Sequence, residues 1–264
     1  MTKKTGYLDS RRLRQGGVAH WDKAPMYSIP GAMISYKVFE EFMGLPAVVN
    51  ADGIVKLESG TWWLKLTGAA DAATGYADAA GGVMTLTCAG AAEDGGQLNL
   101  GGVLASPGAF FPAATKKIWF EAKVHFTNLG TDQLNAFVGL VNPVDTEWLP
   151  DGGGGAMAVQ NVIGWVLQDT ETNWSFVGSQ GAAEAYNDCG AACDTTDDAW
   201  HYLGFLVDGV TSVTCYWDRV AIAAGALATA NIPIVGLMPG FAIKAGDTDA
   251  EELMIDWIQC VELR

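Results

Sequence analysis

The sequence contains no run of apolar residues long enough to cross a membrane, and it contains few charged residues. A transmembrane helix needs about 20 consecutive, mostly apolar residues, and no such run is present. Residues 1–20 have no apolar stretch of the length of a secretory signal and contain Lys and Arg instead. We therefore expect a protein that is made in a cytoplasm and has no membrane partner.

Basic residues are scarce and unevenly distributed. The chain carries 15 Lys and Arg against 30 Asp and Glu, and no basic residue lies between Lys123 and Arg219. Residues 1–37 carry 7 basic and 2 acidic residues, a net charge of +5, whereas the other 227 carry 8 basic and 28 acidic residues, a net charge of −20. Phosphate contacts need Lys and Arg, so we expect no nucleic-acid partner. The basic segment is interpreted as an arm that reaches for a partner; the alternative is a disordered, solubilising terminus.

Histidine and cysteine are too few and too dispersed to predict a metal centre. The chain has 3 His, and its cysteines are Cys88, Cys189, Cys193, Cys215 and Cys260. An odd number of cysteines in a chain without a visible secretory signal predicts mostly reduced thiols. Cys189 and Cys193 can be bridged or bind a metal ion, but no second Cys or His pair lies at ligand spacing, so zinc is not expected.

The sequence does contain many segments with the alternating pattern of β-strands. The clearest is residues 116–127, where five apolar residues from Ile118 to Phe126 fall on one face. Further strands are predicted at residues 61–67, 82–88, 98–105, 135–142, 161–168, 173–179, 199–209, 211–219, 220–225, 233–246 and 252–263. Hairpins are expected between 116–127 and 135–142, between 161–168 and 173–179, and between 199–209 and 211–219. The pattern predicts an all-β fold, a two-sheet antiparallel sandwich.

The first part of the chain has a different character. Residues 1–32 show little periodicity, and residues 36–43 are predicted to form one or two helical turns before a Gly and a Pro. We therefore divide the chain into an extended basic N-terminal arm with a short helix, residues 1–47, and a β-sandwich, residues 48–264.

Three stretches resemble parts of a known fold. Residues 119–126 followed by 136–142 (WFEAKVHF and AFVGLVN) look like its central hairpin, and residues 200–218 look like its Asp-Gly hairpin. Residues 250–262 look like its last strand, which returns beside the N-terminal strand. The fold is the concanavalin A-like jelly roll of legume lectins, laminin G modules and family-16 type glucanases, and the resemblance covers about residues 55–264. It implies a jelly-roll sandwich and says little of activity.

The whole chain is similar to small structural proteins of tailed-bacteriophage virions, through its basic arm, its acidic Gly/Ala-rich jelly roll and its free cysteines. Capsid decoration (cement) proteins resemble it most, followed by head- or tail-fibre pieces. This resemblance implies a non-enzymatic protein on the capsid surface of a virion, with the major capsid protein as partner and a trimer or dimer as its homo-oligomer. The residues of the arm expected to bind the capsid are Lys3, Lys4, Arg11, Arg12, Arg14, Trp21, Tyr27, Ile29, Phe39 and Phe42.

A lectin- or glucanase-like fold raises the question of catalysis. Retaining glycosidases need two carboxylates about 5–5.5 Å apart, and the jelly-roll glucanases supply them from one strand in an E-x-D-x(x)-E arrangement. The sequence has no such run, and its nearest candidates have the wrong spacing or lie in the wrong strand: Asp145, Glu147, Glu251, Glu252 and Asp256. We therefore expect no enzyme activity. The first alternative is a glycan-binding module of a head or tail fibre, with glycans as partner, and the second is a jelly-roll glycoside hydrolase.

Two loops carry the remaining candidates. No cofactor is expected, although the acidic loop 188–198 can offer carboxylates to calcium, and a solvated loop is the alternative. Its calcium candidates are Asp188, Asp194, Asp197 and Asp198. Trp148 is the one tryptophan predicted in a surface loop, where it would contact a protein or a sugar.

Overall fold

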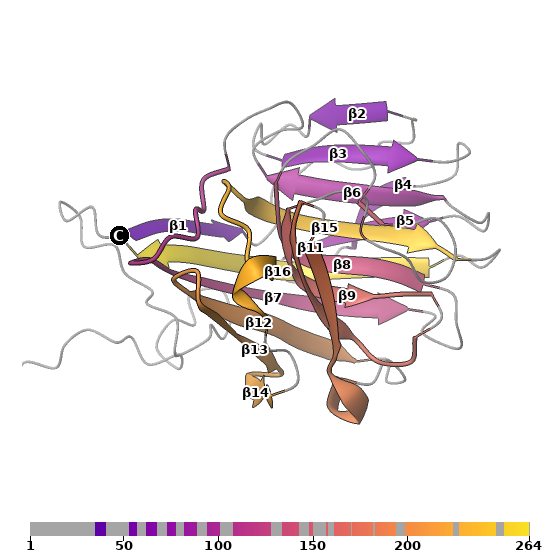
Figure 1. Ribbon diagram of the computed structural model, residues 1–264. Coiled ribbons are helices and arrows are strands. Elements are labelled where there is room, and N and C mark those ends of the chain that lie inside the picture. Colours follow the sequence, from indigo (N-terminus) through magenta and orange to yellow (C-terminus); the bar gives the residue numbers. More distant parts are fainter. Residues whose placement is uncertain are drawn as a thin grey trace, which may run out of the picture.

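The computed structural model is all-β and confirms the predicted sandwich of two antiparallel sheets (Figure 1). The structure describes residues 35–40, 53–56, 62–67, 73–77, 82–88, 94–100, 108–127, 134–142, 148–149, 157, 161–169, 171–181, 183–193, 199–223, 227–246 and 251–263. Helical elements among them include the short 3-10 helices η1 (Gly190–Cys193) and η3 (Thr229–Asn231). In this part of the chain no helix is long and apolar enough to span a membrane.

The first sheet, sheet A, has 8 strands, in the order β14-β13-β12-β7-β16-β5-β4 with β1 also paired to β16. Their bounds are β1 Ser35–Glu40, β4 Ala73–Ala77, β5 Val83–Cys88, β7 Lys117–Thr127, β12 Trp200–Asp208, β13 Ser212–Trp217, β14 Val220–Ile222 and β16 Glu251–Leu263. Most of these strands were predicted from the sequence within a few residues; β1 and β4 were not.

The second sheet, sheet B, also has 8 strands, in the order β11-β10-β9-β8-β15-β6-β3-β2. Their bounds are β2 Gly53–Lys56, β3 Trp62–Thr67, β6 Gly95–Leu100, β8 Leu134–Val141, β9 Val162–Leu167, β10 Ser175–Gln180, β11 Ala183–Asp188 and β15 Met238–Ala245. The predicted hairpin of β9 and β10 is confirmed, and β11 is a further strand that the sequence did not reveal.

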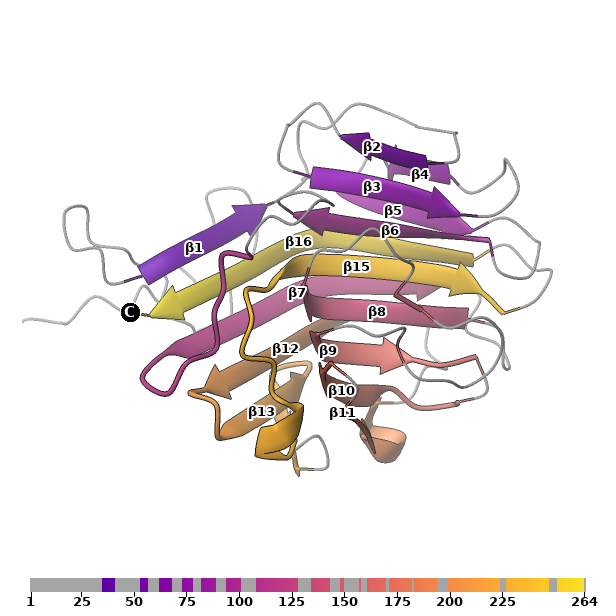
Figure 2. The ribbon, with the colours of Figure 1, turned by 45° about the horizontal axis from the view of Figure 1, so that its top comes forward.

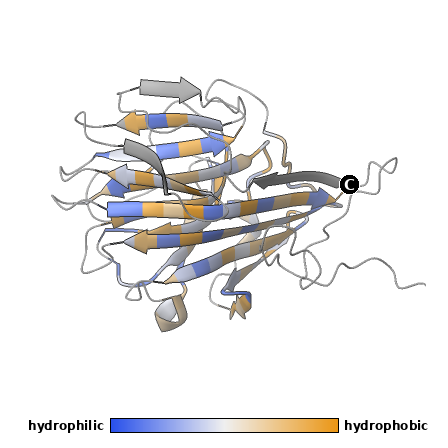
Figure 3. Cartoon of the chain, turned by 180° about the vertical axis from the view of Figure 1, so that it is seen from behind, coloured by the Kyte–Doolittle hydropathy of each residue, from blue (hydrophilic) through white to orange (hydrophobic). Residues whose placement is uncertain are grey.

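The main hydrophobic core lies between the two sheets. On β7, the residues Ile118, Phe120, Ala122, Val124 and Phe126 all face inward and are at most 1% exposed, as their alternation predicts. The view of Figure 3 shows the same alternation of hydrophobic and hydrophilic residues along the strands. Each fully buried aromatic or large aliphatic side chain stabilises the fold by about 1.5–3 kcal/mol.

Aromatic contacts join the sheets at one side of this core. The Trp165 ring of sheet B meets the Trp217 ring of sheet A edge-on, with centroids 5.6 Å apart. The indole N–H of Trp165 donates to the Gly204 carbonyl of β12 at 3.2 Å. Such aromatic pairs contribute about 0.5–1.5 kcal/mol beyond the area that they bury, and the hydrogen bond fixes how the sheets face each other.

The structure corrects the predicted hairpin between residues 116–127 and 135–142. β7 pairs with β12 and β16 in sheet A, whereas β8 pairs with β9 and β15 in sheet B. Both strands have inward-facing apolar residues, and both have partners along their two edges. The chain therefore crosses from one sheet to the other between β7 and β8, a connection that local pattern cannot distinguish from a hairpin.

The structure also corrects the helix predicted at residues 36–43, because Ser35–Glu40 form β1. β1 pairs with β16 from Ser35↔Leu263 to Glu40↔Ile258 (Figure 2). On this edge of β16, β5 pairs only with residues 251–255, so β1 satisfies backbone groups that β5 leaves available. A helix of eight residues is only marginally stable in water, so the strand pairing with β16 is the more stable arrangement. Sheet A thus begins inside the segment that we assigned to the arm.

Candidate functional site

The outer face of sheet B is a candidate site because its side chains point away from the core between the sheets and can contact a ligand. Along β9, Ile163, Trp165 and Leu167 belong to the core between the sheets. Side chains alternate along a strand, so the other residues of β9 point to the outer face. They are Val162, Gly164 and Val166.

A second hydrophobic cluster covers this outer face, and we name it the outer cluster. Its members are all less than 5% exposed: Phe137, Val141, Trp148, Leu149, Met157, Val162, Val166, Val177 and Ala242. β8, β9, β10 and β15 supply the floor of the cluster. Trp148, Leu149 and Met157 lie outside the strands and close over it. An apolar cluster of this kind excludes water from the middle of the sheet face.

Trp148 is the largest residue of the outer cluster and corrects the prediction of a surface tryptophan. Its side chain is 1% exposed. The ring lies edge-on to Phe137 at 6.2 Å between centroids, and its backbone N–H donates to Oε1 of Gln97 at 3.2 Å. A Cβ atom on Gly240 would come within 2.9 Å of the indole. The loop position of Trp148 suggested exposure, but the indole packs down on a floor of small residues.

Two paired glycines form part of that floor. Gly139 of β8 pairs directly with Gly164 of β9. A Cβ atom on Gly164 would lie 2.6 Å from the Val138 carbonyl oxygen and 3.1 Å from the Phe137 ring. The absence of side chains here lets the Phe137 ring pack close to both glycines, which is a packing role for them.

Met157 is held over the cluster by the edge strand β11. Its backbone N–H donates to the Tyr186 hydroxyl oxygen at 2.7 Å and to Oε1 of Glu184 at 2.9 Å. The Tyr186 hydroxyl donates to the same carboxylate at 2.8 Å. Burial raises the pKa of Glu184 above its ordinary value and also raises the pKa of Tyr186. The Glu184 carboxylate and the Tyr186 hydroxyl therefore hold Met157 over the outer cluster, and the Met157 N–H in turn gives each of them a hydrogen bond.

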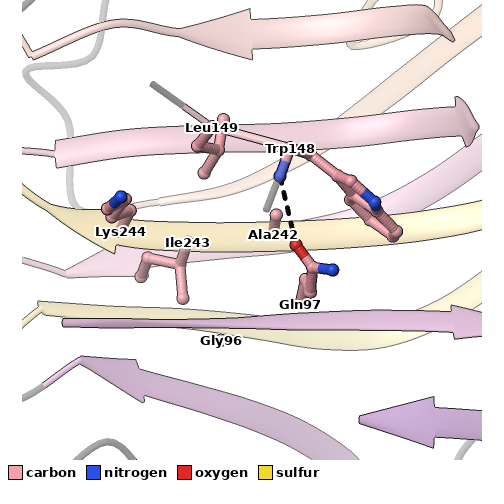
Figure 4. Close-up of a pocket in the computed structure, with 7 residues that line it drawn as sticks. All are labelled: Gly96, Gln97, Trp148, Leu149, Ala242, Ile243 and Lys244. Atoms are coloured by element: carbon pink, nitrogen blue, oxygen red, sulfur yellow. Dashed lines mark hydrogen bonds between the residues drawn. The ribbon is translucent and has the colours of Figure 1, made fainter. Parts of the chain in front are cut away.

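A small pocket remains beside the outer cluster, lined by Gln97, Trp148, Lys244 and their neighbours (Figure 4). It has room for about one water molecule. Pockets that hold small organic ligands measure about 300–1,000 Å³. The pocket is therefore too small for a sugar ring.

The outward residues of β9 determine whether this face can carry out acid–base chemistry on a sugar. A retaining glycosidase needs two carboxylates about 5–5.5 Å apart. The outward positions of β9 carry two valines and a glycine beneath the outer cluster. These residues offer neither a nucleophile nor a proton donor.

The outer face of sheet A is chemically different, because aromatic and charged side chains alternate across it. Arg219 donates to Glu121 at 2.8 Å and lies 4.1 Å from the centroid of the Tyr202 ring. Lys123 pairs with Asp256 at 2.5 Å and lies 4.7 Å from the centroid of the Trp200 ring. These contacts combine cation–π interactions with ion pairs. We use the name charged aromatic face for the six residues that make them: Glu121, Lys123, Trp200, Tyr202, Arg219 and Asp256.

The other predicted site residues fall mostly outside the described part of the chain. Phe39 lies in β1, and the remaining arm residues are outside: Lys3, Lys4, Arg11, Arg12, Arg14, Trp21, Tyr27, Ile29 and Phe42. Of the calcium candidates, Asp194, Asp197 and Asp198 lie outside, and Asp188 accepts the Gly190 N–H at 2.7 Å. Among the described residues, no group of three or more His, Cys, Asp or Glu can hold a metal ion.

Comparison with known proteins shows the fold. No protein-family model and no curated protein matches the sequence. A protein of unknown function from Shewanella oneidensis MR-1 has a TM-score of 0.55 and 12% identity, with 88% of each chain covered. A family-16 glycoside hydrolase of Bacteroides ovatus, solved with a mixed-linkage glucan product, has a TM-score of 0.53 and 15% identity over 84% of this chain and 98% of its own.

An endo-acting O-glycanase from a member of the human gut microbiota is similar to the same degree, with a TM-score of 0.52 and 15% identity over 86% of this chain and 99% of its own. At such identities the likeness concerns the fold alone. The chain therefore has the concanavalin A-like jelly-roll fold, as its sequence predicted, and glycoside hydrolases are among the proteins that share it.

Proposed function

We propose that the protein is a non-catalytic virion component that binds the outer surface of a capsid as a decoration protein. The observation that best supports a non-catalytic role is the outer cluster, because it covers the middle of the outer face of sheet B with buried apolar side chains. Trp148 and Met157 close this face, and the outward residues of β9 carry no carboxylate.

The charge distribution supports binding through the N-terminal segment. Residues 1–37 carry a net charge of +5 on a chain whose net charge is −15. Complementary charge speeds the encounter with an acidic surface, and the acidic body, facing solvent, discourages aggregation of the particles. The partner would be the major capsid protein, and repeated copies on a lattice would add avidity.

The position of β1 sharpens the experiment. Because Ser35–Glu40 belong to sheet A, a deletion should remove residues 1–34 and keep β1. We expect this variant to fold and to lose co-sedimentation with shells assembled from the cognate major capsid protein. A triple variant with Arg11, Arg12 and Arg14 changed to Glu should also lose binding, whereas Lys117→Glu, a charge change on the body, should not. Undiminished binding of the deletion variant would refute the role of the arm.

Glycan binding is a second candidate, favoured by the charged aromatic face and by the hydrolases that share the fold. Trp200 and Tyr202 are partly exposed on this face, and aromatic rings with adjacent charged groups suit sugar stacking. A glycan array separates the two candidates. Specific binding that is lost in a Trp200→Ala, Tyr202→Ala variant would favour glycans, and an array without signal would leave capsid binding as the proposal.

A further inference from the structure

Two cysteines are fixed against the same residue at one end of sheet B. Cys189 follows β11, and Cys193 ends η1. The Cys189 N–H donates to the Trp174 carbonyl at 3.1 Å, and the Trp174 N–H donates to the Cys193 carbonyl at 3.0 Å. Gly190 has a φ of +68°, a conformation that favours glycine, and this turn brings the chain back so that both cysteines meet Trp174.

The Cys189 thiol donates to the Asn187 carbonyl oxygen at 3.5 Å. The neighbouring Cys193 thiol lowers the pKa of Cys189 below its ordinary value. The Cys189 side chain, together with burial, raises the pKa of Cys193. Cys189 is 5% exposed and Cys193 is fully buried. The pair is reduced in the structure, with Cys189 as the sulfur that ionises first and lies nearer to solvent.

We propose that Cys189 and Cys193 are a redox-active pair that closes to a disulfide across η1. Metal binding does not explain the pair, because the described residues contain no cluster of three or more ligands suited to a metal ion. Cys215 lies near enough to raise the pKa of Cys193 and to have its own pKa raised by Cys189, but it makes no backbone contact with Trp174 like those of Cys189 and Cys193. A disulfide requires two residues whose backbones lie close together, and the backbone hydrogen bonds to Trp174 hold Cys189 and Cys193 beside the same residue.

The oxidant in this proposal is a peroxide. The Cys189 thiolate attacks one oxygen of hydrogen peroxide, the O–O bond breaks, and Cys189 becomes a sulfenic acid while hydroxide leaves and is protonated to water. Oxidation removes the Cys189 charge that contributes to the raised pKa of Cys193. Cys193 then attacks the sulfenic sulfur, the S–S bond forms, and the departing hydroxide takes the Cys193 proton and leaves as a second water. Two thiols and one peroxide thus give one disulfide and two waters. A dithiol reductant reverses the oxidation.

The other cysteines provide internal controls. Burial and the adjacent Glu251 carboxylate raise the pKa of Cys88 to about 12, which keeps it a thiol and therefore a poor nucleophile. Cys260 is fully buried, and burial raises its pKa as well. Because burial raises the pKa of both thiols, neither should react at a rate comparable with that of Cys189.

Peptide mapping of the full chain tests the proposal. A tryptic peptide would run from residue 124 to 219 and contain three cysteines, so cleavage before Asp residues is required. That cleavage places Cys189 and Cys193 together in the peptide 188–193 and Cys215 in the peptide 208–217. After brief exposure to hydrogen peroxide, we expect peptide 188–193 to lose the mass of two hydrogen atoms and to resist alkylation, and dithiothreitol should reverse both changes.

Variants resolve the order of the steps. In Cys193→Ser, Cys189 should stop at the sulfenic acid, which dimedone traps; in Cys189→Ser, Cys193 should react far more slowly. Cys215→Ser should leave the disulfide unchanged. The map of the unaltered chain needs no variant, so a folding defect does not remove the test. Two alkylated cysteines in peptide 188–193 after peroxide, a link to peptide 208–217, or equal oxidation of Cys88 and Cys260 would each overturn the proposal.

Discussion

Arg219 donates through Nε to Oε1 of Glu121 at 2.8 Å, and the Glu121 side chain is only 2% exposed. Glu121 lies in the middle of β7 on the outer face of sheet A, whereas Arg219 lies in the turn between β13 and β14 with a φ of 69°. Arg219, near the edge of sheet A, thus neutralises the carboxylate of Glu121 near the centre of the sheet. Because an isolated buried charge costs several kcal/mol, loss of Arg219 should lower the free energy of unfolding.

Replacing Arg219 should therefore destabilise the protein more than replacing an exposed partner. We choose Arg219→Asn because asparagine tolerates a positive φ, and we expect the free energy of unfolding to fall by about 2–3 kcal/mol in urea titrations. Lys117→Ala breaks an ion pair whose side chains are 46% and 47% exposed, and it should cost less than about 1 kcal/mol. Equal losses in the two variants would show that the burial of Glu121 is not what matters.

Trp148→Ala should open the outer cluster. Truncation of a fully buried tryptophan costs about 3–5 kcal/mol, and the cover over Phe137 and Val166 would be lost. We expect a matching decrease in the urea midpoint and new binding of a hydrophobic dye. Trp148→Phe retains an aromatic ring and should lose less than half as much. A decrease below about 1 kcal/mol in Trp148→Ala would contradict the closed face.

The paired glycines beneath Phe137 should not tolerate a methyl group. In Gly139→Ala the new Cβ would lie 2.4 Å from the Ile163 carbonyl oxygen, a backbone atom that cannot move alone. We expect a loss of about 2–3 kcal/mol, measured by thermal unfolding. Gly96→Ala is the matched control, because its Cβ would meet only the ends of two leucine side chains, Leu66 at 3.4 Å and Leu86 at 3.9 Å. Similar losses at both positions would mean that the close approach of β8 and β9 is not responsible.

Asp218 should contribute to the acid sensitivity of the fold. Burial alone would raise its pKa, but hydrogen bonds from His201 and the Tyr202 N–H, with the charges of His201 and Arg219, hold the pKa below its ordinary value. A carboxyl with a lowered folded pKa stabilises the protein above its unfolded pKa of about 3.9, and that stability disappears as the pH falls through the folded pKa.

Unfolding in urea between pH 3 and pH 7 measures this contribution. The Asp218 side chain is 43% exposed, so solvent screening keeps the effect below about 1 kcal/mol. Asp218→Asn should lose this amount at pH 7 and approach the parent protein at pH 3. A constant difference between the two proteins across the range would argue against the role of the charge.

The sequence predicted the sheets better than the way in which they connect. Alternation along 116–127 identified β7 and its inward face, because burial of one face of a strand leaves a period of two. The same pattern cannot tell which sheet a strand joins, so β8 was placed beside β7. β1 was mistaken for a helix because its pairing with β16 joins residues more than two hundred positions apart in the chain.

The closed outer face was the least predictable feature. Trp148 and Met157 lie outside the strands, and their burial depends on contacts with Gln97 and Tyr186 from distant elements. The Gly139–Gly164 pair offered a signal, since glycine inside a strand often marks a close approach of another group. The spacing of Cys189 and Cys193 did predict that the two residues can be bridged, but the contacts of Trp174 with both residues come only from the fold.

The pairing of Ser35 with Leu263 has a practical consequence for labelling this protein. Because Ser35 of β1 pairs with Leu263 of β16, a fluorophore attached at Leu263 would lie beside the first residue of β1. Such a label would obstruct a partner that binds next to Ser35. A probe at the other end of β16, where Glu252 pairs with Thr127, would report on the sandwich from a distance and leave that approach clear.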